Sequence, residues 1–304
     1  MIRAISSRGG SRAGRMAGVA ATVLLGLLLT ARPASLAEAD PSAEAGRQAV
    51  LRDVARSADQ RLAELLAQLE AARDPARQGA ALVVDGTDPP EPPLRDAATR
   101  LEAAGPAADY AAIANRRLVG ALESVQPDLA GLLADPLPSA GDLISIAGQL
   151  RSAAEASTTF VARRHAAQQT LAGLQDALAA LERDDVASAL QALDAAERAR
   201  FELQDWERPP PTLALWLSTT AELIDAARAI ADATLAGDPE AARAAADAYA
   251  AAAENARRAD ISLALSLSET GAGLTSTPMR RLADALATTT AARAAVASLL
   301  QVER

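Results

Sequence analysis

The most regular pattern of hydrophobic positions lies between Asp142 and Asp185, where large apolar residues recur every seven positions. One set of such positions holds Leu143, Leu150, Leu171 and Leu178, and the set three positions later holds Ile146, Phe160, Leu174 and Leu181. A seven-residue step of this kind predicts a long helix in coiled-coil-like packing. No helix breaker occurs before Asp184-Asp185, so we expect a single helix over 142–183.

This long helix needs a partner for its apolar side. The next helix is expected over 186–206, with Leu190, Leu193 and Leu203 facing inward. Because the connection between the two helices is short, an antiparallel pair within the chain is the favoured interpretation. The alternative is a homo-oligomer that forms through the 142–183 helix.

The remainder of the C-terminal part predicts further amphipathic helices, which span 212–235, 238–267 and 278–300. Gly237 and Asp238 have the residue types that end one helix and cap the next, and Pro239 suits the first turn. Glu269–Pro278 is rich in Gly, Ser and Thr and predicts a loop.

The N-terminal part alternates helical segments with prolines. Asp40-Pro41 predicts the start of a helix to Arg73, interrupted by Asp74-Pro75. Asp85–Pro93 is the clearest candidate for a linker. Shorter helical segments follow up to Ala134–Gly141. Two regions are therefore expected after residue 39, a helical region over 40–135 with proline-rich loops and a helical-hairpin bundle over 136–304.

No segment shows the alternation of β-branched and polar residues that predicts a strand. Half of the residues are hydrophobic, but alanine makes up much of that share, and alanine favours closely packed helices. The expected fold class is all-α: an alanine-rich bundle of antiparallel helical hairpins with one long coiled-coil-like helix, after an N-terminal signal segment.

Residues 1–39 have the parts of a secretory signal. Four arginines and no acidic residue precede Met16–Ala31, which is apolar and uncharged over 16 residues, and Ala37 and Ala39 form a signal-peptidase site. We expect cleavage after Ala39 and export of the rest. As a helix the apolar segment spans about 24 Å, less than the roughly 30 Å of a bilayer core. The alternative is a single uncleaved N-terminal membrane anchor.

Charge and composition exclude several classes of function. The chain has a net charge of −9, and loss of residues 1–39 removes five arginines and one glutamate, which leaves −13. Such an acidic chain repels phosphate backbones, so no nucleic-acid partner is expected. There is no cysteine and no lysine, which excludes disulfides, thiolate catalysis and lysine-dependent chemistry.

Residues that could support catalysis or metal binding are few. His165 is the only histidine and directly follows Arg163 and Arg164. It is expected to point to solvent, so neither a catalytic nor a metal-binding role is expected. Asp85, Asp88 and Glu91 cluster, but their spacing is not that of a calcium loop. Gly271–Ser276 lacks the last glycine of a phosphate-binding pattern. We expect no catalytic residue, no metal and no cofactor.

Three of the six aromatic residues, Phe201, Trp206 and Trp216, lie around a run of three prolines. One hypothesis makes them a small aromatic pocket that binds a cationic or apolar ligand, with Glu202, Asp205 and Glu207 nearby. The favoured interpretation is structural: prolines end one helix and stiffen the link to the next, and the rings fill space that alanine leaves open.

These observations predict an exported, non-catalytic helical protein of a bacterial cell envelope or its surroundings, acting through protein interaction or scaffolding with an unknown protein partner. Contact with a membrane is expected only through an uncleaved N-terminal segment. The first alternative is an extracytoplasmic ligand-binding or sensory domain that uses residues 201–217. A remote alternative is a hydrolase that works through carboxylates, since such sites need only geometry.

Overall fold

The computed structural model describes residues 41–86 and 88–302. The chain divides between Ala49 and Val50 into two units, and the packing below is that of the second unit. The described residues form α-helices and no strand, so the predicted all-α class is confirmed. The helices are α2 (Pro41–Asp85), α3 (Glu91–Ala103), α4 (Gly105–Leu122), α5 (Pro127–Leu133), α6 (Ala140–Leu181), α7 (Val186–Phe201), α8 (Leu213–Ala236) and α9 (Pro239–Val302).

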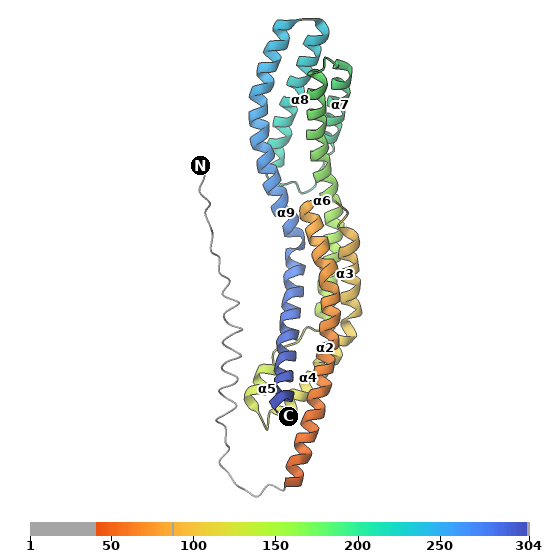
Figure 1. Cartoon of the computed structure of the whole chain (residues 1–304), viewed down its shortest axis with the longest axis vertical. Coiled ribbons are helices and arrows are strands. Elements are labelled where there is room, and N and C mark those ends of the chain that lie inside the picture. The colour runs from red at the N-terminus through yellow and green to blue at the C-terminus, as the bar shows by residue number, and fades with distance from the viewer. Residues whose placement is uncertain (1–40, 87, 303–304) are drawn as a thin grey trace. The chain divides into compact units, whose positions relative to one another are not determined.

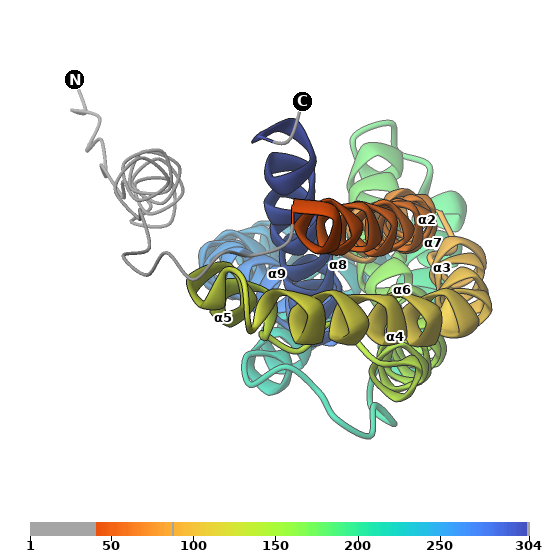
Figure 2. The same ribbon diagram turned by 90° about the horizontal axis from the view of Figure 1, so that it is seen from below.

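The long helix predicted over 142–183 is present as α6, and it is the central helix of this unit. α6 contacts α3, α4, α7, α8 and α9. In Figure 1, α7 and α8 lie beside the C-terminal half of α6 and the first half of α9, while α3 lies beside the N-terminal half of α6. Figure 2 shows α4 running crosswise to these helices.

The apolar seam of α6 is turned toward other helices of the same chain. Leu143, Ile146, Leu150, Phe160 and Leu174 are all buried. α7 packs against α6 after a tight turn, as the antiparallel interpretation predicted. The two backbones approach closely at Gly173, where an added Cβ would lie 2.9 Å from the Cβ of Ala196. Small residues on both helices make this approach possible.

α6 begins at Ala140, two residues before the predicted start at Asp142. Ser139 is its N-cap, and the Asp142 backbone N–H donates to Ser139 Oγ at 3.1 Å. The Asp142 carboxylate in turn accepts from the Ser139 N–H and Oγ–H at 3.0 and 2.6 Å. This is a reciprocal capping box, in which the acid at the third helical position completes the cap.

The prediction that a helix ends at Arg73 is wrong, because α2 continues through Pro75 to Asp85. Its buried residues alternate steps of three and four on both sides of the proline; they are Leu51, Ala55, Ala58, Leu62, Leu65, Leu69, Ala72, Ala76, Gly79 and Val83. A proline removes one backbone hydrogen bond of a helix. Burial of this continuous seam offsets the loss, and α2 therefore spans the predicted break.

The predicted loop over Glu269–Pro278 is also wrong, since α9 is continuous from Pro239 to Val302 and contains Pro278. Gly271 lies where an added Cβ would come within 3.3 Å of the Val83 carbonyl and 3.1 Å of the Phe160 ring. The glycine therefore serves close packing of α9 on α2 and α6. Glycine predicted a loop here because the sequence does not show which helices pack against this position.

The α8–α9 turn agrees with the prediction, whereas two other helix boundaries differ from it. At the α8–α9 turn Gly237 has φ +67°, and Asp238 Oδ1 accepts from the N–H groups of Glu240 and Ala241 at 3.0 Å, so the predicted end and cap are confirmed. The expected linker over 85–93 is shorter, because α3 already begins at Glu91. α7 ends at Phe201 rather than at Trp206.

Two groups of buried apolar residues fill this unit. The larger contains residues from α2 to α6, from the start of α8 and from α9, and thus from both sides of the boundary expected at residue 135. The smaller joins α6, α7, α8 and α9, and its members are Leu174, Ala177, Leu193, Ala196, Leu223, Ile224, Ala227, Ala252 and Ala256. Alanine dominates this second group, so its helices contact through short side chains.

Candidate functional site

The predicted aromatic group does not assemble into one cluster. Phe201 ends α7 and is 49% exposed, with the Arg200 guanidinium 4.8 Å from its ring centre. Trp206 is half-buried and meets Phe160 of α6 edge-on, with ring centres 6.0 Å apart. Trp216 on α8 has no exposed surface. Each ring therefore packs against a different partner.

Trp216 is held between α8 and α9. Its indole N–H donates to Asp260 Oδ1 of α9 at 3.4 Å, and nearby the Thr212 hydroxyl donates to the Ser262 carbonyl at 3.5 Å. A fully buried indole with its N–H paired leaves no face for a ligand. Trp216 thus serves packing at the proline corner, while Phe201 is the most exposed of the three rings.

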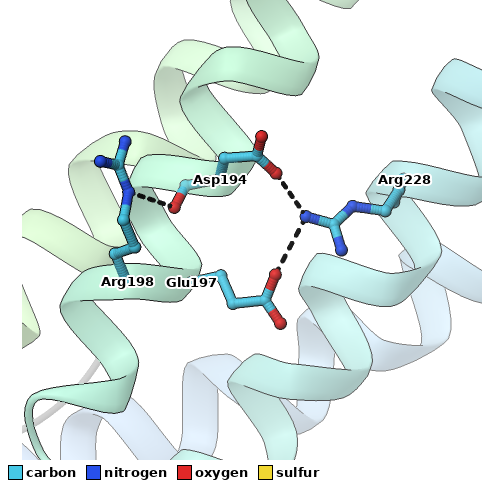
Figure 3. Close-up of polar contacts among 4 residues, drawn as sticks. All are labelled: Asp194, Glu197, Arg198 and Arg228. Atoms are coloured by element: carbon cyan, nitrogen blue, oxygen red, sulfur yellow. Dashed lines mark hydrogen bonds and ion pairs between the residues drawn. The ribbon is translucent and has the colours of Figure 1, made fainter.

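Phe201 borders a shallow hollow of about 410 Å³ that is also lined by Asp194, Glu197 and Arg198. Figure 3 shows the polar side of this region. Arg228 of α8 donates through Nη2 to Asp194 Oδ1 at 2.7 Å and to Glu197 Oε2 at 3.0 Å, both on α7. Arg198 donates to the Asp194 carbonyl at 3.1 Å.

The ion pairs in this region link two helices. Hydrogen bonding to Glu197 and the nearby carboxylates raises the pKa of Arg228 above its usual value. Both carboxylates contact the same guanidinium, each through one oxygen. This arrangement fixes α7 on α8.

A second hollow, of about 610 Å³, lies between α6 and α9 and is lined mainly by small residues, among them Ser145, Gly148, Ser152 and Gly273. Arg281 of α9 lies close to one of these residues and donates to Ser145 Oγ at 2.8 Å. The sequence did not predict this groove, because it forms between two helices that are far apart in the chain.

The candidates for metal or phosphate chemistry are dispersed in the described residues. His165 is exposed, and its Nε2 lies 2.9 Å from Gln169 Nε2. Asp85 and Asp88 are exposed, while Glu91 pairs with Arg95 at 2.8 Å. No group of three potential metal ligands occurs among the residues that the structure describes. Gly271–Ser276 is part of α9.

Large apolar side chains lie exposed on several helices of the described part of the chain. They are Tyr110, Ile113, Ile144, Phe201, Leu215, Leu235, Ile261 and Leu265, with further examples outside the helix middles at Val50, Val125 and Leu132. Apart from Phe201, the sequence pattern does not distinguish these residues, since in an amphipathic pattern every large apolar residue is first assigned to the buried side.

The signal segment, with the predicted cleavage site at Ala37 and Ala39, lies outside the described residues. None of the helices in the described ranges is both long and apolar enough to cross a membrane.

No protein-family model, curated protein or solved structure matches this chain. Its function is therefore inferred from its own residues.

Proposed function

We propose that this protein is an exported, non-catalytic helical component of a cell envelope that acts by protein interaction or scaffolding. The observation that carries the proposal is the set of exposed large apolar side chains on helices whose buried faces are already filled. Such side chains gain free energy when a partner removes them from water. The basic and apolar pattern of residues 1–31 supports export.

Ion pairs between helices support a role as a rigid frame. Arg151 of α6 pairs with Glu102 of α3, and its Nη2 lies 2.6 Å from Glu102 Oε2. Arg228 joins α8 to α7, and Arg293 of α9 donates to Asp59 of α2 at 3.3 Å. Surface pairs of this kind add little stability each, but they fix which helix faces lie side by side.

Photo-crosslinking in the native host tests the interaction role. A crosslinking amino acid at Tyr110, Phe201 or Ile261 should give adducts with one or a few envelope proteins or with the chain itself. Glu123, which is exposed at the end of α4, is the matched polar position and should give few adducts. Adducts that are as frequent at Glu123 as at the apolar positions would contradict the proposal.

Export has its own test. The intact mass of the protein from its host should correspond to a chain that begins at Asp40, and Ala39→Arg should prevent cleavage because signal peptidase requires a small residue there. A mature N-terminus near Met1 together with membrane fractionation would instead support the uncleaved anchor. Recovery of the full-length chain in the cytoplasm would contradict export altogether.

The hollow beside Phe201 favours a second candidate function, the binding of a cationic amphiphile. Its lining combines an exposed ring with the carboxylates of Asp194 and Glu197, and such a ring attracts cations. Dodecyltrimethylammonium below its micelle concentration is a suitable compound for calorimetric titration. Binding that is lost in Phe201→Ala but kept in Leu235→Ala would support this function, and equal heats in both variants would argue against it.

A further inference from the structure

The outer face of α9 carries two exposed apolar side chains. A basic residue lies on their N-terminal side and an acidic residue on their C-terminal side. Ile261 is 55% exposed and Leu265 is 64% exposed, and they lie one turn apart on the same helix face. The opposite face of the same segment is core, where Ala259, Leu263 and Leu267 are buried. Tyr110 and Ile113 form another exposed pair, but there Arg61 covers the tyrosine ring at 5.3 Å.

Charged residues continue this row at four-residue steps. Arg257 precedes Ile261 and Glu269 follows Leu265, and both are exposed. Neither makes an ion pair within the described ranges, whereas the neighbouring Arg258 is paired with Glu254 at 3.0 Å. We call Arg257, Ile261, Leu265 and Glu269 the outer α9 row. It reads basic, apolar, apolar, acidic from its N-terminal to its C-terminal end.

The outer α9 row is complementary to its own reversed copy. When two such rows lie antiparallel, Ile261 of one copy meets Leu265 of the other, and Arg257 meets Glu269 at both ends. A parallel arrangement would instead bring Arg257 to Arg257 and Glu269 to Glu269, which like-charge repulsion disfavours. Rows of residues four apart are the ridges that interdigitate in the commonest helix–helix packing.

The residues beside the row permit close approach of a second helix. Ala264, Ser268 and Ala272 are small and exposed, and α9 lies along one edge of the helices over this stretch in Figure 1. Two helix axes pack at about 8–10 Å when the side chains at the contact are small. The face is thus open to a partner helix without rearrangement of its neighbours.

We infer that the outer α9 row is a self-association surface, through which two copies of this chain pair antiparallel about an axis near Leu263. The inference rests on the proposed interaction role and specifies its partner as a second copy. It places self-association on α9 rather than on the α6 seam, whose large residues are largely buried within one chain. Two apolar residues per copy make a small interface, so the dimer is concentration-dependent.

Sedimentation equilibrium on the full chain tests this surface. The weight-average mass should rise from monomer toward dimer between about 1 µM and 1 mM, the range of weak interfaces. Leu265→Ser should keep the monomer mass over that range. Leu235→Ser is the matched control, because Leu235 is 65% exposed on α8, and it should dimerise like the unsubstituted chain.

A charge-reversal mixture tests the antiparallel register. R257E and E269R should each dimerise at least about tenfold more weakly, because every end contact becomes like-charged. A 1:1 mixture of R257E and E269R should form heterodimers with affinity near that of the unsubstituted chain, since both end contacts are then of opposite sign. The double variant R257E/E269R should dimerise again. Circular dichroism should show unchanged helicity in all of them, because both positions are exposed.

Several outcomes would overturn the inference. They are a monomer mass for the unsubstituted chain at every concentration, equal loss of dimer in Leu235→Ser and Leu265→Ser, or a mixture no stronger than either single variant. If the purified chain stays monomeric while a crosslinker at Leu265 captures a different envelope protein, the row docks that protein instead. That result would reject self-association and leave the proposed interaction role standing.

Discussion

Trp216 shows how one residue at the proline corner contributes to stability. Its side chain has no exposed surface, and replacing a fully buried tryptophan by alanine removes apolar contacts and leaves a cavity. We expect Trp216→Ala to lower the free energy of unfolding by about 3–5 kcal/mol, measured by urea denaturation. Phe201→Ala should change it by less than about 1 kcal/mol, because half of that side chain is already in water.

Equal losses in the two variants would contradict this assignment of roles. A Trp216→Ala protein of normal stability that lost a ligand would make the corner a binding site instead.

Asp142 gives the capping box a pH dependence. Hydrogen bonds from the Ser139 side chain and backbone, with Arg281 nearby, lower the pKa of its carboxyl below the usual value. The stabilisation is complete above the unfolded pKa near 3.9 and is lost as pH falls through the lower folded value. The side chain is 55% exposed, so solvent screening keeps the contribution to about 1 kcal/mol or less.

We therefore expect stability to fall as the pH drops below about 4 and through the lower folded pKa of Asp142, and to fall less in Asp142→Asn, which lacks the titrating group. Asp109→Asn, at an exposed position on α4, is the control and should keep the full decline. The readout is the urea midpoint as a function of pH. An unchanged slope in Asp142→Asn would show that the cap does not depend on the carboxylate.

At the scale of elements, the two internal prolines mark where local signals and packing disagree. The sequence predicts a break at Pro75 and a loop ending at Pro278, yet α2 and α9 pass through both. Buried positions recur over about seven residues on both sides of each proline, and alanine occupies many of them. Alanine is common on all faces of these helices, so the repeat can be recognised only once burial is known.

Pro75 tests how far packing offsets a helix breaker. Pro75→Ala restores the N–H that can donate to the Ala71 carbonyl and should raise the free energy of unfolding by about 1–3 kcal/mol. Pro127 at the first position of α5 is the control, because proline is favourable there, and Pro127→Ala should be neutral or slightly destabilising. A loss of stability in Pro75→Ala would show that the ring itself packs productively.

At the scale of the whole unit, the two buried groups differ in extent. The larger group has 41 members and includes Phe160 and Trp216, whereas the smaller group has nine, of which five are alanine. Beyond the smaller group, most of Gly237–Ala251 is exposed. Segments with few buried apolar contacts open at lower free energy than the core.

Native-state hydrogen exchange should resolve this difference within a single helix. Amides of residues 239–251 in α9 should be protected at least about tenfold less than those of residues 282–296, which pack in the larger group. Comparing two parts of one helix removes differences in helix type. Uniform protection along α9 would mean that the unit unfolds only as a whole.

The sequence alone determined the properties that depend on local chemistry. Helical periodicity predicted the all-α class and the long helix over 142–183, and the Gly237-Asp238 pair predicted the α8–α9 turn, because capping and backbone preferences act over a few residues. Export and the non-catalytic role remain predictions. Only the tertiary structure decided the continuity of α2 and α9, the burial of Trp216 and the exposure of Ile261 and Leu265. These depend on burial against distant helices, which a local pattern does not contain.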